Sequence, residues 1–170
     1  DRKTRKVVWS YDSGVANGNR GKAIEVHAFQ PLGGGRVMIA ESGVGRIIEI
    51  DRAGKIHRTI KLHVKKPHPH RDTRLVRKLA TGNYLVCHEG DGAVREYDGK
   101  SGQVVWDYDV PLFGKERRGG HGPEAWGNQC FAAVRLKNGN TLIATGNGHS
   151  VLEVTPAGKI AWKLEQKDLP

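Results

Sequence analysis

"LKNGNTLIATGNGHSVLEVTPAGKIAWKL", residues 136–164, is the stretch of sequence that decides the fold. Short β-rich runs such as "TLIA", "VLEV" and "KIAWKL" alternate in it with turns that contain glycine. Helical spacing fits no useful length of the stretch, because the glycines stand where a helix would be broken. The pattern therefore predicts a series of short strands joined by tight turns.

Two earlier stretches repeat the same pattern. "LGGGRVMIAESGVGRIIEIDRAGKIHRTI" at 32–60 and "LATGNYLVCHEGDGAVREYDGKSGQVVWDY" at 79–108 align with residues 136–164 when one insertion is allowed. A leucine, a glycine and a glutamate recur in register in all copies: Leu32, Leu79 and Leu136; Gly35, Gly82 and Gly139; Glu49, Glu96 and Glu153. The N-terminal "KVVWSY" matches only the last strand of a copy.

Repeats of this length, with four strands in each, are typical of the blades of a β-propeller. We predict an all-β chain in which 1–170 form a single propeller segment of one leading strand and three four-stranded blades. The leading strand is expected at about 6–11, and the blades at about 26–62, 73–110 and 130–166. Closed propellers have about four to eight blades, so the segment is expected to be part of a six- to eight-bladed ring. Either further blades of a longer chain or a second copy would complete it, and the extra leading strand favours the longer chain.

The turn that precedes each closing strand carries a family resemblance. "YDGKSGQVVW" and "VTPAGKIAW" resemble the repeats of the pyrroloquinoline-quinone-type propellers, and the "NGNTL" turn is similar to that of the arylsulfotransferase-like propellers. The resemblance spans nearly the whole chain and is specific for the fold, not for an activity. It implies that the closing tryptophans pack between blades: Trp9, Trp106 and Trp162.

The repeated glutamates could be read as catalytic carboxylates, since paired carboxylates perform acid and base chemistry. Their identical register in Glu49, Glu96 and Glu153 favours a structural role instead, because one active site needs unlike groups from different blades. We expect them to make hydrogen bonds or ion pairs between adjacent strands.

The formal net charge of +10 suggests an acidic partner. The basic residues are scattered over "DRKTRK", "KLHVKK", "RDTRLVRK" and "GKERR", and no helix-turn-helix, zinc finger or RNP-like aromatic pair accompanies them. Nucleic-acid binding is therefore not expected. No apolar run approaches the roughly 18 residues that span a bilayer, so no membrane span is expected either.

Unlike groups gather on the links between blades, where variation and function are expected. If the propeller topology holds, these links and the turns between second and third strands share one face. The candidate ligand-binding residues on that face are His27, His70, Arg71, Arg74, His88, His121, Trp126 and Asn128.

Four kinds of chemistry suit these residues to different degrees. "HPH" at 68–70 places two imidazoles close together, but no third ligand stands at a diagnostic spacing, so no metal site is predicted. Sulfuryl transfer of the arylsulfotransferase type would use a histidine nucleophile, and nothing identifies which one. A quinone cofactor is not expected, because the repeat alone does not imply one. We favour a binding or scaffold module for a protein, a glycan or a small anionic ligand, so whether the chain is an enzyme stays open.

The two cysteines fall on neighbouring predicted blades. Cys87 and Cys130 are compatible with a disulfide or with two buried thiols, and they stand outside any CxxC pattern. The resemblance to extracytoplasmic propellers favours a periplasmic or secreted location.

Overall fold

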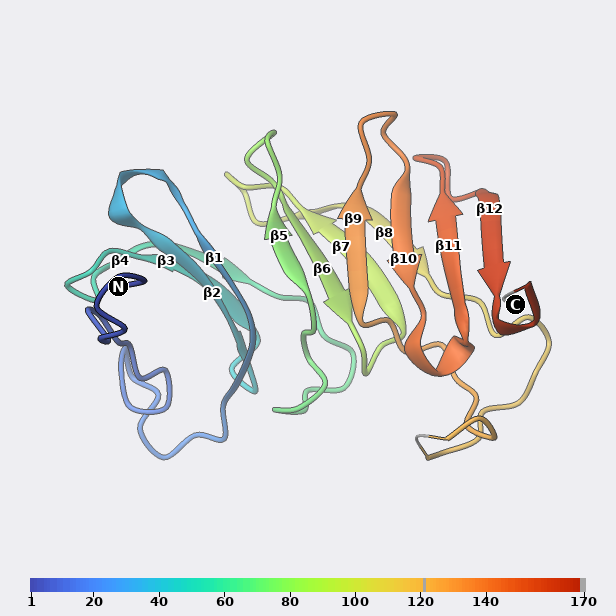
Figure 1. Ribbon diagram of the computed structural model, residues 1–170, viewed down its shortest axis with the longest axis horizontal. Helices are drawn as coiled ribbons and strands as arrows, with labels where there is room; N and C mark the ends of the chain where they lie inside the picture. The colour runs from blue at the N-terminus through green and yellow to red at the C-terminus, as the bar shows by residue number, and fades with distance from the viewer. Residues whose placement is uncertain (121, 169–170) are drawn as a thin grey trace.

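Three four-stranded antiparallel sheets make up the chain in the computed structural model, which describes residues 1–120 and 122–168 (Figure 1). Blade 1 contains β1 (Glu25–Pro31), β2 (Val37–Ser42), β3 (Arg46–Ile50) and β4 (Ile56–Lys61). Blade 2 contains β5 (Val76–Lys78), β6 (Tyr84–His88), β7 (Ala93–Tyr97) and β8 (Val104–Asp109). Blade 3 contains β9 (Ala132–Arg135), β10 (Thr141–Ala144), β11 (Ser150–Val154) and β12 (Ile160–Glu165). Short 3-10 turns lie at η1 (Gly33–Gly35), η2 (Gly146–Gly148) and η3 (Gln166–Asp168).

Within each sheet the strands are paired in chain order. The same register shift follows the repeated glutamate in every blade, between Glu49 and Ile50, between Glu96 and Tyr97, and between Glu153 and Val154. Such a β-bulge increases the local twist of a strand pair. The blades stand side by side along the long axis of the molecule, with the two chain ends at opposite ends (Figure 1). The repeat is therefore a structural unit, and the chain is a segment of a β-propeller.

The predicted leading strand at about 6–11 is not a strand in the structure. A strand is defined by its ladder of hydrogen bonds, and residues 5–12 have no paired strand in the described chain. The segment lies against blade 1 instead: Trp9 and Tyr11 stack at 6.3 Å and pack on Ile48, and Trp9 Nε1 donates to Arg52 O at 2.9 Å. The described chain contains no neighbouring strand for this segment, so the leading strand stays a prediction.

Apolar side chains fill the two junctions between blades. The core between blades 1 and 2 includes Met38, Ile47, Ile60, Val76 and Tyr84. The core between blades 2 and 3 includes Leu85, Val94, Tyr108, Ile143 and Leu152. At roughly 25 cal/mol per Å² of buried apolar surface, these junctions supply the main driving force that holds one blade on the next.

The repeated glutamates bridge neighbouring blades, as expected of a structural residue. Glu49 on β3 pairs with Lys78 on β5 of the next blade. One junction later, Glu96 on β7 pairs with Arg135 on β9 at 2.6 Å. Glu153, the third copy, pairs with no cation in the part of the chain that the structure describes. The prediction of an ion pair is confirmed for the two internal junctions.

The closing strands make a second repeated contact. Trp106 Nε1 donates to Pro156 O at 3.0 Å, in the turn that precedes the closing strand of the next blade. Arg58 stands where a tryptophan is missing from blade 1, and it donates to Gly99 O in the matching turn of blade 2. Trp162 in blade 3 is 47% exposed. The packing role expected for the closing tryptophans thus holds wherever a following blade is present.

The two cysteines are free thiols buried between blades 2 and 3. Cys130 Sγ donates to Ala93 O at 3.1 Å. Contact with Cys130 and burial raise the pKa of the Cys87 thiol well above its ordinary value. Of the two roles left open by the sequence, the structure shows the buried, protonated thiol.

Candidate functional site

One end of the blades carries the β2–β3, β6–β7 and β10–β11 turns together with both long links, and we call it the loop face. The links cover 62–75 and 110–131. Backbone hydrogen bonds tie the links to the turns: Gly90 N donates to Arg71 O at 2.9 Å, and Gly127 N donates to Asn147 O at 3.2 Å. The links are therefore held against the blades, and their side chains have defined neighbours.

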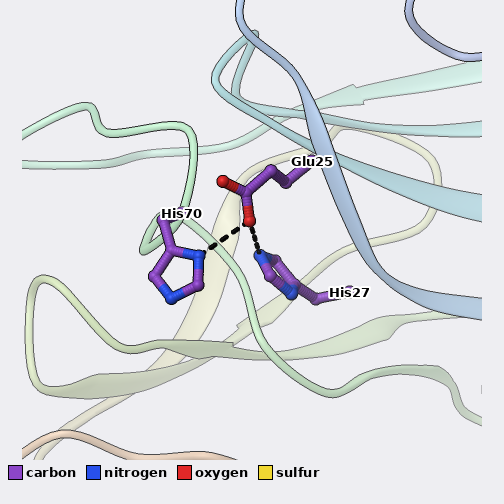
Figure 2. A group of neighbouring side chains, drawn as sticks. All are labelled: Glu25, His27 and His70. Carbon is purple, nitrogen blue, oxygen red and sulfur yellow. Dashed lines mark hydrogen bonds and ion pairs between the residues drawn. The ribbon is translucent and has the colours of Figure 1, made fainter.

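Two strand residues and one link residue meet at the edge of this face. Glu25 and His27 both lie on β1, where a β-bulge between Val26 and Ala28 leaves His27 without a paired residue on β2. His70 reaches the same point from the first link, so that both imidazoles face one carboxylate oxygen (Figure 2). Glu25 Oε2 lies 2.7 Å from His70 Nδ1 and 3.1 Å from His27 Nε2.

Arg74 determines which nitrogen of each imidazole accepts a hydrogen bond. It lies 3.1 Å from His27 Nδ1 and 2.8 Å from His70 Nε2. A guanidinium only donates, so both of these nitrogens accept, and each ring of a neutral imidazole carries its proton on the other nitrogen. The proton on His70 Nδ1 is donated to Glu25, whereas His27 Nε2 is buried and makes no hydrogen bond with any described residue. Burial and the charge of Arg74 lower the pKa of His27, and the hydrogen bond from His70 lowers the pKa of Glu25.

Arg74 is itself held in place from two other directions. Its Nε donates to Glu89 Oε2, and its guanidinium carbon lies 5.2 Å from the centre of the Phe131 ring. The Arg74 and Glu89 side chains are 16% and 9% exposed. We call Glu25, His27, His70, Arg74 and Glu89 the histidine–arginine cluster.

The arrangement of donors in the cluster disfavours a metal ion. A histidine that binds a metal through one nitrogen carries its proton on the other and donates it to an acceptor. Here the other nitrogens of His27 and His70 face the donors of Arg74, so binding a metal would turn two N–H groups against a guanidinium. The potential ligand atoms of Glu25, His27 and His70 lie within 4.8 Å of one another, and the Glu25 carboxylate among them already accepts from His70 Nδ1.

A small pocket of about 240 Å³ lies next to the cluster and shares Glu89 with it. We call it the arginine pocket, after the three arginines among its lining residues: Arg71, Arg117 and Arg118. Trp126, Asn128 and Gln129 from the second link complete the lining together with three glycines. Among the described residues neither Arg71 nor Arg117 pairs with a carboxylate, and Arg118 lies 3.8 Å from Glu124 with both side chains exposed. The pocket is therefore strongly electropositive.

Glycines let the second link approach the pocket closely. A Cβ on Gly92 would lie 2.2 Å from Asn128 Nδ2, and a Cβ on Gly127 would lie 2.1 Å from Gln129 Oε1. Only glycine at these two positions leaves room for the amides. Trp126 is fixed by its Nε1, which donates to Leu112 O at 3.2 Å.

A family model described as PQQ_2, "Outer membrane protein assembly factor BamB", matches residues 1–169. The chain belongs to this family. No curated protein matches the chain. The family membership agrees with the blades and with the repeated junction contacts.

Several solved structures are similar to the chain in fold. A protein of unknown function from Bacteroides caccae has a TM-score of 0.65 and 21% identity over 86% of this chain and 48% of that protein. Virginiamycin B lyase from Staphylococcus aureus, solved with quinupristin, has a TM-score of 0.60 and 18% identity over 89% of this chain and 43% of that protein. The WD40 β-propeller domain of Doa1 has a TM-score of 0.59 and 17% identity over 85% of this chain and 41% of that protein. At these identities the likeness shows the fold alone, and the chain spans less than half the length of each structure.

The structure divides the candidate residues that the sequence suggested into groups. His27, His70 and Arg74 meet in the cluster, whereas Arg71, Trp126 and Asn128 line the arginine pocket. His121 lies outside the described residues. Sequence reasoning missed Glu25, Arg117 and Arg118 as members of the site. Glu25 had one available signal, its place two residues before His27 in the sequence.

His88 lies inside blade 2 and not on the surface of the loop face. Its side chain is 0% exposed; Nδ1 donates to Asp72 O at 2.7 Å, and Nε2 accepts from the Tyr97 hydroxyl at 2.9 Å. Burial lowers its pKa to about 4, so the ring is neutral near pH 7. Because the first link covers this strand end, His88 stabilises the blade and is closed to a ligand.

Proposed function

We propose that this propeller segment is a binding module whose loop face holds the anionic group of a ligand in the arginine pocket. The observation that carries the proposal is the meeting of Arg71, Arg117 and Arg118 in one small pocket. Guanidinium groups bind carboxylate and phosphate oxygens through paired, charge-assisted hydrogen bonds. The net charge of +10 would also attract an anionic ligand from a distance.

The size of the pocket bears on the kind of ligand. Pockets for drug-sized molecules measure about 300–1,000 Å³, and the arginine pocket, at about 240 Å³, is smaller. It suits one charged group with its immediate neighbours. That group belongs to a small free ligand or to the end of a larger protein or glycan.

We place the module outside the cytoplasm, in the periplasm or as a secreted protein. The support is the family, whose model is described as an outer membrane protein assembly factor. No helix among the described residues has the length and apolarity to cross a bilayer. Fractionation of cells that produce the protein tests the location: recovery with a cytoplasmic marker contradicts it.

Sulfuryl transfer through a histidine is the alternative, and the cluster does not favour it. A nucleophilic imidazole needs one nitrogen with a free lone pair directed at the substrate. The lone pairs of His27 and His70 already accept from Arg74. Assay of the protein with 4-nitrophenyl sulfate tests this alternative, and turnover lost in His70→Gln would revive it.

Isothermal titration calorimetry of the protein with acetate, inorganic phosphate and galacturonate tests the binding function. We expect at least one of these anions to bind, and the Arg71→Gln/Arg117→Gln variant to bind it at least about tenfold more weakly, since a hydrogen bond to a charged group contributes about 1.5–3 kcal/mol. The matched control is Arg36→Gln, which removes an exposed arginine at the opposite end of blade 1. Absence of binding by all three anions, or equal weakening in the control, contradicts the proposal.

A further inference from the structure

The residues that line the arginine pocket fall into two chemically different sets. Arg71, Arg117 and Arg118 supply cationic donors. Glu89 and Gln129 carry acceptor oxygens, a carboxylate and a side-chain carbonyl. An inorganic anion offers only acceptor oxygens, so it pairs with the first set and is repelled by the carboxylate in the second.

Gln129 Oε1 is the more telling of the two acceptors. The atom is buried, and no hydrogen-bond partner for it exists among the described residues. A buried carbonyl oxygen without a partner costs about 1–3 kcal/mol, which a ligand donor would recover. Gly127 makes this placement possible, because a Cβ at that position would lie 2.1 Å from Oε1.

Glu89 adds a second acceptor without adding a full negative charge. Its carboxylate is paired with Arg74, which His27 and His70 hold from the far side. The cluster therefore fixes one carboxylate at the pocket wall and offsets its charge. Glu89 keeps lone pairs that accept from a neutral O–H group.

We infer that the arginine pocket binds a carboxylate whose neighbouring atoms carry hydroxyl groups, the chemistry of a sugar acid. The carboxylate faces the arginines, and the hydroxyls donate to Gln129 Oε1 and Glu89. The volume of about 240 Å³ suits one monosaccharide unit. The inference rests on the proposed function and adds the class of ligand to it.

Calorimetry of the purified protein at low salt with three probes distinguishes the contribution of the arginines from that of the acceptors Glu89 and Gln129. Galacturonate carries both the carboxylate and the hydroxyls, acetate carries only the carboxylate, and galactose carries only the hydroxyls. We expect galacturonate to bind at least about tenfold more tightly than acetate, the gain of one or two satisfied acceptors. We expect no measurable binding of galactose.

Two variants locate the source of the preference. Gln129→Met keeps the length of the side chain but removes its acceptor, and Gly127→Ala displaces that acceptor without demanding a left-handed backbone. Both are expected to weaken the binding of galacturonate about five- to twentyfold and to weaken the binding of acetate much less. Circular dichroism and the melting temperature confirm that each variant is folded.

The outcomes distinguish this inference from the function on which it rests. Equal binding of acetate and galacturonate, or no effect of Gln129→Met, overturns the sugar-acid inference and leaves the anion-binding function standing. No binding of any anion overturns both, and binding of galactose as tight as that of galacturonate does the same. Digalacturonate separates the two sources of the unit: tighter binding than galacturonate assigns the end of a glycan, and equal binding assigns the free acid. Both of these results support the inference.

Discussion

Carboxylates pair with cations in two regions of the molecule, and the two regions differ in one respect. At the junctions, Glu49 and Glu96 occupy the same repeat position and each reaches a cation on the next inner strand. On the loop face, Glu25 and Glu89 have no counterparts and meet two histidines and one arginine. Repetition accompanies contacts that hold blades together, because every junction needs the same contact. Unlike groups in one place point to recognition.

A second difference separates the internal junctions from the exposed end of blade 3. Trp106 and Glu96 reach the following blade, whereas Trp162 and Glu153, at the same repeat positions, face away from the described blades. Equivalent residues therefore stand in unequal surroundings within one chain. This makes each internal residue comparable with a matched control of the same type.

The largest effect is expected from Glu49→Ala. Burial raises the pKa of Glu49, but hydrogen bonds from Lys78 and Tyr84 outweigh it and hold the pKa below its ordinary value. Removing one partner of a buried ion pair costs about 3–5 kcal/mol. Because Lys78 is 27% exposed, we expect a loss of about 2–4 kcal/mol in the free energy of unfolding, measured with urea.

Glu153→Ala is the matched control for Glu49→Ala. Glu153 accepts from Asn140 at 2.6 Å on the exposed end of blade 3 and bridges no described junction. Its loss is expected to change the free energy of unfolding much less than the loss of Glu49 does, because an exposed carboxylate contributes little. Equal losses in the two variants would contradict the assignment of the repeated glutamate to the junctions.

The next effect concerns the closing tryptophans. Trp106→Ala removes the ring that packs at the second junction and its hydrogen bond to Pro156 O. We expect this variant to lose roughly 2–3 kcal/mol, somewhat below the value for a fully buried ring. Trp162→Ala in the same chain is expected to lose much less, since that ring is 47% exposed. A loss of stability as large as that of Trp106→Ala would show that Trp162 is covered in solution.

Acid should destabilise the protein through His88. Its folded pKa of about 4 lies below the ordinary value of 6.5, so between these pH values the unfolded chain binds the proton and the folded chain does not. Stability is therefore full above pH 6.5 and falls as the pH decreases toward 4, by about 2–3 kcal/mol. Urea unfolding at several pH values in this window measures the slope.

His88→Gln keeps one donor for Asp72 O and one acceptor for Tyr97 but does not titrate. The variant is expected to have a flatter dependence of unfolding free energy on pH between 6.5 and 4.5. An unchanged slope would assign the acid sensitivity to other groups, of which His27 also has a lowered pKa.

The smallest effect is expected on the affinity of the histidine–arginine cluster for Zn²⁺. Arg74→Met/Glu89→Gln removes the donors that hold His27 and His70, together with the carboxylate that would be left unpaired. We expect calorimetry to show about 10- to 100-fold tighter Zn²⁺ binding in this variant than in the wild type. Adding His70→Gln to this variant is expected to return its Zn²⁺ affinity to that of the wild type. Equally tight binding by the wild type would contradict the role assigned to Arg74.

The four-stranded blades could be predicted from the sequence because their signals are local and repeated. Glu49 and Glu96 stand in register, and the glycine turns punctuate every blade. The leading strand stays a prediction, because a ladder depends on a second strand that the local pattern does not contain. His88 was misplaced because its burial depends on the first link, which folds over it from another blade.

The site could be predicted only in part. His27, His70 and Arg74 were suggested by residue type and by their place on loops, but their mutual hydrogen bonds depend on how a link lies against β1. Arg117 and Arg118 looked like scattered charge in the sequence. Only the fold of the second link brings them to the same pocket as Arg71.

We propose that the loop face recognises the ligand, whereas the repeated junctions hold the fold together. The most direct test measures the Kd of the tightest-binding anion and the melting temperature for two variants side by side, Arg117→Gln and Glu96→Gln. We expect Arg117→Gln to raise the Kd about tenfold or more at an unchanged melting temperature, and Glu96→Gln to lower the melting temperature at an unchanged Kd. A Kd that depends on Glu96 and not on Arg117 would contradict this division of roles.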